Sequence, residues 1–278
     1  MKIFDFDAKF YDYVRVQMAM QPALKEDEIE EKYNQMMTSW LNAPAQWLDG
    51  VKPVDYFKRY SAPKDLIKLF NEYMARDIGL PEPLYARIVE IGQSSAEEGF
   101  IPSALTRIAG DREKPEKLRA TAIALLRDMG SRQPVELFID MICRCTEMDE
   151  LSEMACDSLR DMDIDLSDRL LARYEDAPAY AKIMILDVVA HGPGRAKVYD
   201  LLVDALMRDD GHRGLYAGLL AEVGDERAIE PLREAERLSD LNYLDYLEIR
   251  GAIEMLGGEP GEPRTFDGDP AYEAMRSL

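Results

Sequence analysis

The chain has 278 residues, 47% of them hydrophobic, and its 54 acidic and 34 basic residues give a net charge of −20. This hydrophobic content supports a substantial core and is too high for an intrinsically disordered chain. The negative charge repels phosphate backbones and anionic lipid headgroups, so we expect neither nucleic acid nor a membrane surface as partner. An acidic surface that keeps an intracellular protein soluble explains the charge; attraction of a basic partner is the alternative.

The amino-terminal residues carry charges at positions 2, 5, 7 and 9, so we expect no secretory signal peptide. No run approaches the roughly 18 apolar residues that a transmembrane helix requires. The three cysteines, Cys143, Cys145 and Cys156, are too few and too unevenly spaced to predict a metal site or a disulfide. Together these features favour the reducing cytoplasm as the location.

Residues 1–80 predict several short helices that do not follow the pattern seen later in the chain. Aromatic residues are dense near the amino terminus, where a helix begins close to Asp7 and ends at Pro22. The segment KEDEIEEKYNQMMTSWL predicts a second helix, whose early acidic residues suit the positive end of a helix dipole. Two further helices start near Pro53 and Ser61. We expect this region to form a helical cap on the repeats that follow.

The phrase WLNAPAQWLDGVKP, which contains Trp47, lies between these helices. Over about fifteen residues it resembles the toxin-docking segment of ParS-type antitoxins. This resemblance covers no other part of the chain, and it implies a toxin–antitoxin or phage-related partner role.

From residue 81 onward, an apolar helical pattern with a similar ending recurs six times. The endings lie at Gly92, Gly130, Asp163, Gly192, Gly224 and Gly257. Successive endings are 38, 33, 29, 32 and 33 residues apart. A helix of this kind cannot fold alone, so each must pack on a partner helix and on the neighbouring pairs.

When the six units are aligned on these endings, three columns stay mostly apolar, as expected for one buried helix face. Eight residues before the ending stand Leu84, Ala122, Ala155, Met184, Tyr216 and Ile249. Four residues before it stand Ile88, Leu126, Leu159, Val188, Leu220 and Ile253. One residue before it stand Ile91, Met129, Met162, His191, Val223 and Leu256.

The last unit, residues 225–258, is the clearest copy, and its Gly257 suits a left-handed helix C-cap. The phrase GDERAIEPLREAERL, which opens it, resembles a HEAT-like repeat of the kind shared with phycobilin-lyase-type proteins. The resemblance covers roughly residues 81–258. It implies an all-α, right-handed α-solenoid of helix pairs, with first helices on the convex side and second helices lining the concave side. Because this family serves mostly as scaffold and adaptor, the resemblance implies no activity.

Beyond the last unit, the segment GEPGEPRTFDGDP is dense in glycine and proline. We expect an irregular carboxy-terminal tail over residues 259–278. Phe266 and Tyr272 could fold back onto the last helix pair, and a flexible terminus is the alternative.

Residues that could carry chemistry are sparse. The only histidines are His191, in an otherwise apolar column, and His212, in a polar turn; two histidines cannot supply the ligands of a zinc or di-iron site. No GxSxG, P-loop, GxGxxG or CxxC motif occurs. Carboxylate pairs are abundant but fall at helix ends and turns. We predict no catalytic residue, no metal and no cofactor.

The positions three, six and ten residues before each helix ending should face away from the core. They form a candidate partner-binding strip, expected on the concave face, that comprises Arg127, Glu153, Asp157, Arg160, Lys182, Leu186, Val189, Gly214, Gly218 and Ala221. The strip is apolar in its middle because the helix AKIMILDVVAH is hydrophobic nearly all round. Either the chain itself covers this middle, or it forms an open groove for an apolar helix or an extended peptide.

These patterns favour a non-enzymatic cytoplasmic adaptor that binds another protein or peptide through the strip. The first alternative is a HEAT-type enzyme, either phycobilin-lyase-like or DNA-glycosylase-like. The glycosylase would need a cationic channel for DNA, which the charge balance opposes, and the lyase has no distinguishing motif here. The toxin–antitoxin or phage-related role is the second alternative.

Overall fold

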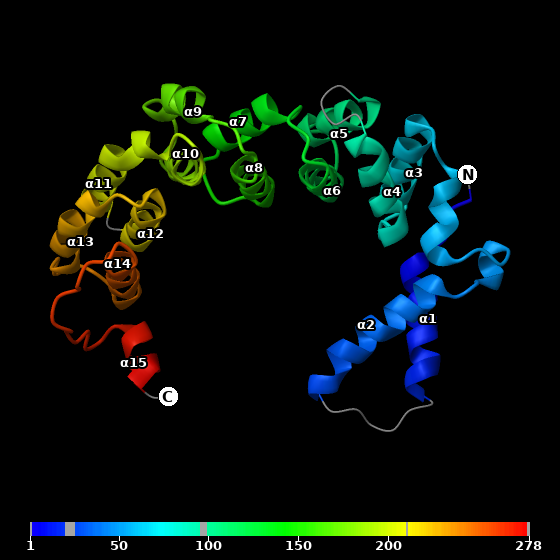
Figure 1. Cartoon of the computed structure of the whole chain (residues 1–278), viewed down its shortest axis with the longest axis horizontal. Helices are drawn as coiled ribbons and strands as arrows, with labels where there is room; N and C mark the ends of the chain where they lie inside the picture. Colours follow the sequence, from blue (N-terminus) through cyan, green and yellow to red (C-terminus); the bar gives the residue numbers. More distant parts are fainter. Residues whose placement is uncertain (1, 20–25, 95–98, 210, 277–278) are drawn as a thin grey trace. The chain divides into compact units, whose positions relative to one another are not determined.

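The computed structural model describes residues 2–19, 26–94, 99–209 and 211–276, and in these residues the regular structure is helical, with no strand (Figure 1). The expected all-α class is therefore confirmed. Backbone contacts divide the chain into two compact units, Met1–Val135 and Glu136–Leu278. None of the described helices combines the length and the apolarity that are needed to cross a bilayer.

The first unit consists of six α-helices and two short 3-10 helices among its described residues. They are α1 (Phe6–Ala19), α2 (Glu26–Asn42), η1 (Gln46–Leu48), η2 (Pro53–Arg59), α3 (Pro63–Ala75), α4 (Glu82–Gln93), α5 (Phe100–Gly110) and α6 (Glu116–Asp128). Helix α3 packs on α4 and α5 packs on α6, while α3 also contacts α5 and α4 contacts α6. Two helix pairs thus stack directly, and α3 joins the stack although it lies in the expected cap region.

An aromatic cluster holds the amino-terminal helices on this stack. Phe6 lies at its centre, with its ring centroid 5.0 Å from that of Trp47 and 5.4 Å from that of Phe57. The hydroxyl of buried Tyr73 on α3 donates a hydrogen bond to the carbonyl of Phe4 at 3.0 Å. Such edge-on and tilted ring contacts stabilise the fold beyond the burial of apolar area alone. The cluster therefore connects α1 and α2 to α3.

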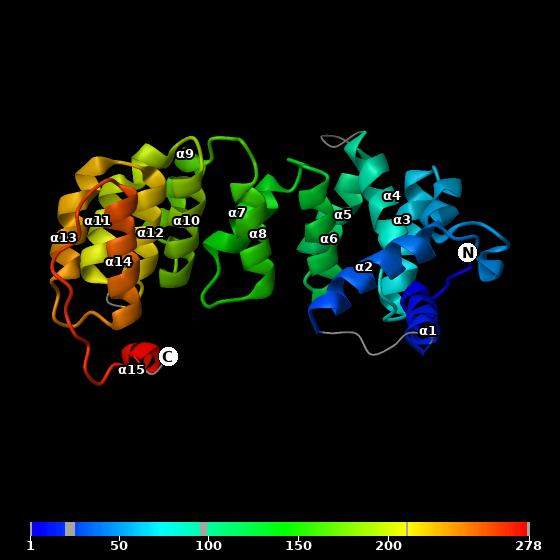
Figure 2. The same ribbon diagram turned by 60° about the horizontal axis from the view of Figure 1, so that its bottom comes forward.

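The second unit continues the alternation of first and second helices. Its elements are α7 (Val135–Cys143), α8 (Glu150–Arg160), α9 (Ser167–Tyr174), α10 (Ala179–His191), η3 (Arg195–Val198), α11 (Tyr199–Arg208), α12 (Arg213–Val223), η4 (Glu226–Ala228), α13 (Ile229–Glu236), α14 (Tyr243–Met255) and α15 (Pro270–Arg276). Second helices α8, α10, α12 and α14 pack on one another in that order, and the last three run side by side (Figure 2). First helices α11 and α13 also touch.

The apolar columns of the six second helices are confirmed in two of three positions. All residues at the positions eight and four before the endings are buried. In the position one before the ending, Met129, Val223 and Leu256 are buried, but His191 is exposed. The periodicity therefore identifies the core face of each helix over its last two turns and loses accuracy at the helix end.

Glycine at the helix ends has the expected conformation at some positions only. Gly130, Gly224 and Gly257 have φ of 64°, 76° and 82°, the left-handed region in which a side chain is strained. Gly92 lies inside α4, and Gly192 ends α10 in an extended conformation. The left-handed cap expected at Gly257 is confirmed.

The segment after α14 folds back onto the last helix pair. The carboxylate of Glu236, on α13, is 5% exposed and accepts hydrogen bonds from Arg250 at 2.7 Å and from the amide of Gly261 at 2.9 Å. The ring of Phe266 lies 4.8 Å from that of Tyr246. The segment is irregular at first, as expected, but it then forms α15, a helix that the expected irregular tail omits.

Candidate partner-binding surface

The ten residues of the predicted strip fall in both units. Arg127 lies on α6 of the first unit, and the other nine lie on α8, α10 and α12 of the second unit. Glu153 is exposed and Asp157, Arg160 and Lys182 are half-buried, as their outward-facing positions predict. Gly218 and Ala221 on α12 are also partly exposed.

The apolar middle of the strip is covered by the chain itself. Leu186 is 1% exposed and Val189 is 2% exposed. Helix α10, which carries them, is surrounded by α8, α9, η3 and α12, and its outer side presents half-buried Asp187 and exposed His191. The expectation that Leu186 and Val189 face outward is therefore wrong, because a helix that is apolar all round does not fix which side packs inward.

Gly214 is buried as well, against the next second helix. Its amide donates a hydrogen bond to the carboxylate of Asp245 on α14 at 2.9 Å. A Cβ at this position would lie 2.7 Å from that carboxylate and 3.1 Å from Cβ of Glu248. The close backbone approach expected at Gly214 thus occurs, but the approaching element is α14 of the same chain.

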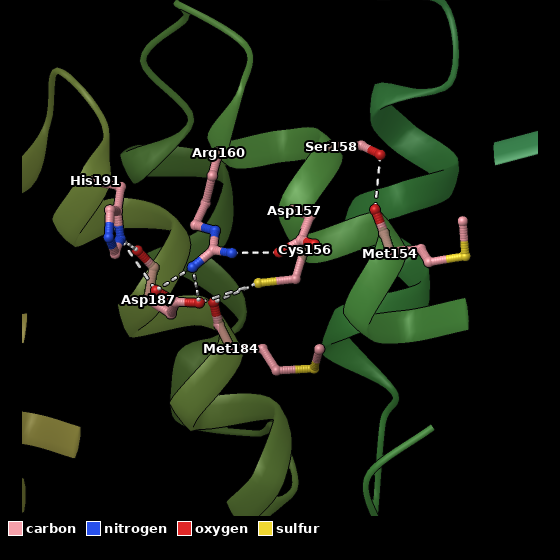
Figure 3. Close-up of polar contacts among 8 residues, drawn as sticks. All are labelled: Met154, Cys156, Asp157, Ser158, Arg160, Met184, Asp187 and His191. Carbon is pink, nitrogen blue, oxygen red and sulfur yellow. Dashed lines mark hydrogen bonds and ion pairs between the residues drawn. The ribbon is translucent and has the colours of Figure 1, made fainter. Parts of the chain in front are cut away.

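A polar network joins α8 to α10 beside the covered apolar residues (Figure 3). Nη1 of Arg160 lies 3.2 and 3.3 Å from the two carboxylate oxygens of Asp187, and Nη2 bonds Asp157 on its own helix. The thiol of Cys156 lies 3.4 Å from the same Asp187 carboxylate. Nδ1 of His191 donates to the carbonyl of Asp187 at 2.9 Å. Asp187 is therefore the centre of the network.

The network holds Cys156 as a neutral thiol. Burial raises the pKa of this thiol, and the negative charge of Asp187 raises it further. A thiol is nucleophilic only as thiolate, so Cys156 acts here as a hydrogen-bond donor between helices. The side chain of His191 is engaged with Asp187 on its own helix. These hydrogen bonds and the ion pair connect α8 to α10.

The second histidine lies in the loop before α12. Nδ1 of His212 is 2.9 Å from the carboxylate of Asp209, which also accepts a hydrogen bond from Tyr216 at 2.9 Å. Burial alone would raise the pKa of Asp209, but the hydrogen bonds from Tyr216 and His212 lower it. Within the described ranges no group of three or more histidine, cysteine, aspartate or glutamate residues could hold a metal ion.

Helix α14 presents large apolar side chains to solvent along one face. Leu244 is 59% exposed, Leu247 41% and Met255 71%. With Gly251, these residues fall at i, i+3, i+7 and i+11, so they share one side of the helix. We call Leu244, Leu247, Gly251 and Met255 the α14 stripe. A Cβ at Gly251 would have no described atom outside its own helix within 4 Å, so the stripe is open at its centre.

The neighbouring helix α12 extends this open surface. Gly218, a member of the predicted strip, likewise has open space where a Cβ would stand, and Leu215 is 46% exposed. Three exposed carboxylates lie on these two helices: Glu222 on α12, and Glu248 and Glu254 on α14. Among the described residues none of the three forms an ion pair. The surface thus combines apolar side chains with unneutralised negative charge.

The sequence contained a signal for this surface. Continuing the outward columns into the unit that ends at Gly257 gives Leu247, Gly251 and Glu254, three residues that the predicted strip does not include. All three lie at the accessible face of α14. The predicted strip therefore includes covered residues of α10 and omits exposed residues of α14.

The antitoxin-like segment contributes to the core of the first unit. The ring of Trp47 lies 5.4 Å from Phe4 and 6.2 Å from Trp40, in addition to its contact with Phe6. Leu48 in the same segment is 1% exposed. Trp40 and Leu48 of this segment are therefore buried in the first unit, and Trp47 is half-buried against the same aromatic cluster.

Comparison with known proteins identifies no relative. No protein-family model, no curated protein and no solved structure matches this chain.

Proposed function

We propose that this protein is a non-enzymatic, cytoplasmic protein-binding scaffold. Its helix pairs form a right-handed α-solenoid of HEAT-like repeats behind an N-terminal helical cap. The partner is a protein segment that forms an amphipathic helix with basic residues beside its apolar face. This helix docks along the α14 stripe and the adjoining face of α12.

The order of the helix contacts supports the repeat architecture. Within the second unit, each second helix packs on the next, from α8 through α14, and the two columns eight and four residues before the endings are buried in every second helix. Stacks in which each unit contacts only its neighbours present a continuous row of second helices. Such a row is a suitable surface for an elongated partner.

The exposed apolar face of α14 is the observation that carries the proposal. Single exposed apolar residues are ordinary, but Leu244, Leu247 and Met255 follow one helical face, with open space at Gly251 between them. A helix-in-groove partner uses the same spacing of apolar anchors. Gly218 and Gly251 remove side-chain bulk where the partner backbone would lie.

The charge pattern selects the chemistry of the partner. Glu222, Glu248 and Glu254 have no described ion-pair partner, and the whole chain carries a net charge of −20. A basic partner would be attracted over a distance of about 10 Å at moderate salt, and an acidic one would be repelled. The apolar anchors supply affinity, and the carboxylates supply orientation and selectivity.

A pair of designed peptides tests this proposal. Each peptide has leucines at i, i+3, i+7 and i+11 on one face; one carries lysines beside this face and the other glutamates. Fluorescence anisotropy should show binding of the lysine peptide only. Glu248→Lys/Glu254→Lys should weaken it about tenfold or more, and Leu247→Ser/Met255→Ser should abolish it.

The matched control is Glu147→Lys/Glu175→Lys, which makes the same charge change at exposed positions away from the α14 stripe. This variant should leave the affinity for the lysine peptide within about twofold, once the effect of the changed net charge on electrostatic attraction is taken into account. Equal binding of both peptides, or equal loss in both charge variants, would contradict the proposal. Self-association of the protein through the stripe, seen as a concentration-dependent mass that Leu247→Ser removes, would replace it with a second copy as the partner.

A further inference from the structure

A groove in the first unit combines an apolar floor with basic side chains at its rim. It has a volume of about 950 Å³ and lies between α3, α5 and the start of α6. We call it the α3–α5 groove. Small-molecule pockets in proteins commonly measure about 300–1,000 Å³, so its size suits an organic ligand.

The floor and walls of the groove are apolar. Ile67 on α3, Ala104 on α5 and Leu118 on α6 reach the groove with only 7–8% of their surface exposed. Phe100, at the start of α5, is 43% exposed and forms part of the wall. Such a surface gains free energy when an alkyl chain displaces water from it.

The rim of the groove carries two basic side chains that have no partner among the described residues. Arg107 and Lys114 line the groove, and neither forms an ion pair or a side-chain hydrogen bond with a described residue. The third basic residue, Lys117, bonds the carboxylate of Asp77 at 2.7 Å. The remaining carboxylate, Asp111, accepts a hydrogen bond from the amide of Glu113 at 3.1 Å.

This charge arrangement is unusual for the molecule as a whole. The chain carries 20 more acidic than basic residues, yet the groove has three basic and two acidic residues at its rim. Exposed charges farther away than about 10 Å are largely screened at moderate ionic strength, so the local charges decide which ligand head group is attracted. An anion is therefore favoured at Arg107 and Lys114.

We propose that the α3–α5 groove binds a fatty acid. The alkyl chain lies on the floor formed by Ile67, Ala104 and Leu118, and the carboxylate accepts hydrogen bonds from Arg107 and Lys114. The planar guanidinium of Arg107 can bind both carboxylate oxygens at once. A small polar anion would leave the apolar floor unused, and a neutral apolar ligand would leave the two cations unused.

Isothermal titration calorimetry with laurate, below its micellar concentration, tests the proposal on the full-length protein. Laurate should bind at one site. Dodecyltrimethylammonium, which has a similar chain and the opposite charge, should bind at least tenfold more weakly. Arg107→Glu/Lys114→Glu should weaken laurate binding at least tenfold, and Ala104→Trp should abolish it by filling the floor.

The matched control is Lys52→Glu/Lys64→Glu, which reverses two exposed basic residues outside the groove lining. It should keep laurate affinity within about threefold. Circular dichroism shows whether Ala104→Trp is folded. If Ala104→Trp does not fold, Arg107→Glu/Lys114→Glu still tests the proposal, because this variant changes exposed side chains only. The proposal is overturned if the two surfactants bind equally, if both charge variants behave alike, or if an acidic amphipathic peptide binds where laurate does not.

Discussion

Helices α10 and α14 are the second helices of repeats that are separated by one repeat, and they differ in what surrounds them. Each has 13 residues, and each is apolar over much of its circumference. Helix α10 is surrounded by α8, α9, η3 and α12, whereas α14 packs on α12, α13 and α15. As a result, Leu186 and Val189 are covered on α10 and Leu244, Leu247 and Met255 remain exposed on α14. Neighbours, more than composition, decide which apolar helix face reaches solvent.

The polar residues of the two helices show the same contrast. Asp187 on α10 is bound by Arg160, Cys156 and His191. On α14, Glu248 and Glu254 have no ion-pair partner among the described residues. The carboxylate of Asp187 on α10 therefore stabilises the fold. The carboxylates of Glu248 and Glu254 on α14 are available for contacts with another molecule.

The largest expected effect is a difference in stability between variants on the buried face of α10 and on the exposed face of α14. Leu186→Ala should lower the free energy of unfolding by about 2–5 kcal/mol because it leaves a cavity in the core around α10. Leu247→Ala should change it by about 0.5 kcal/mol or less because the side chain is largely exposed. Urea denaturation followed by circular dichroism measures both. Equal shifts of the two denaturation midpoints would contradict the conclusion that Leu186 is buried and Leu247 is exposed.

The next prediction compares the half-buried carboxylate of Asp187 with an exposed carboxylate on α11. Asp187→Ala should cost about 1–3 kcal/mol because it removes the acceptor that half-buried Arg160 shares with the thiol of Cys156 and leaves Arg160 with Asp157 on its own helix. The control is Asp204→Ala, which removes the exposed pair with Arg208 on α11 and should cost about 0.5 kcal/mol or less. Thermal unfolding of the two variants measures the difference, and an equal loss would show that the network adds nothing beyond an ordinary surface pair.

Two glycines give a smaller test with opposite signs. Gly251→Ala on the open face of α14 should stabilise the protein by roughly 0.5–1 kcal/mol, because alanine favours a helix and no described neighbour obstructs its Cβ. Gly214→Ala should destabilise it, because the new Cβ would meet Asp245 and Glu248. Denaturation midpoints should move in opposite directions; a common direction would mean that α12 and α14 adjust to each other freely.

The smallest effect concerns the carboxy-terminal segment at the start of α14. The carboxylate of Asp269 accepts a hydrogen bond from the amide of Tyr243 at 3.0 Å, which lowers the pKa of Asp269; bonds from the amides of Tyr272 and Ala271 lower it further. Because the pKa is lowered in the folded state, the stabilisation is complete above the unfolded-state value. It is lost as pH falls through the folded value.

Hydrogen exchange measures this attachment at the amide of Tyr243. Its protection, corrected for the intrinsic rate, should decrease at acidic pH and should already be low at neutral pH in Asp269→Ala, which has no side-chain acceptor. The matched variant Asp267→Ala removes an exposed carboxylate in the same segment and should leave that protection unchanged. Equal loss of protection in the two variants would show that the Asp269 hydrogen bond is not what holds the segment.

The sequence predicted the features that depend on local periodicity. Residues such as Leu84 and Ile253 recur at fixed distances from the helix endings, and all members of their columns are buried. The orientation of α10 could not be read in this way, because a helix with apolar residues on every side has no periodic signal for its inner face. Its contacts with α8, α9 and α12 select that face.

Two other features depend on contacts between segments distant in sequence. Glu236 and Gly261 are brought together only when the chain returns after α14, so a glycine- and proline-rich segment appeared irregular throughout. The α3–α5 groove requires Ile67, Ala104 and Leu118 to converge from three helices. Neither spacing nor composition encodes that convergence, and only the three-dimensional structure shows that Arg107 has no ion-pair partner in the described part of the chain.

The return of the chain to Glu236 sets a practical limit on shortening this protein. A version that stopped at Gly258 would contain every helix of the repeats, yet the buried Glu236 carboxylate would lose the amide of Gly261, and Arg250 would lose the carbonyl of the same residue. Water would then have to enter the interior beside α13 and α14. For recombinant work, residues 259–276 should therefore be retained, and any tag should be placed after the last residue of the chain.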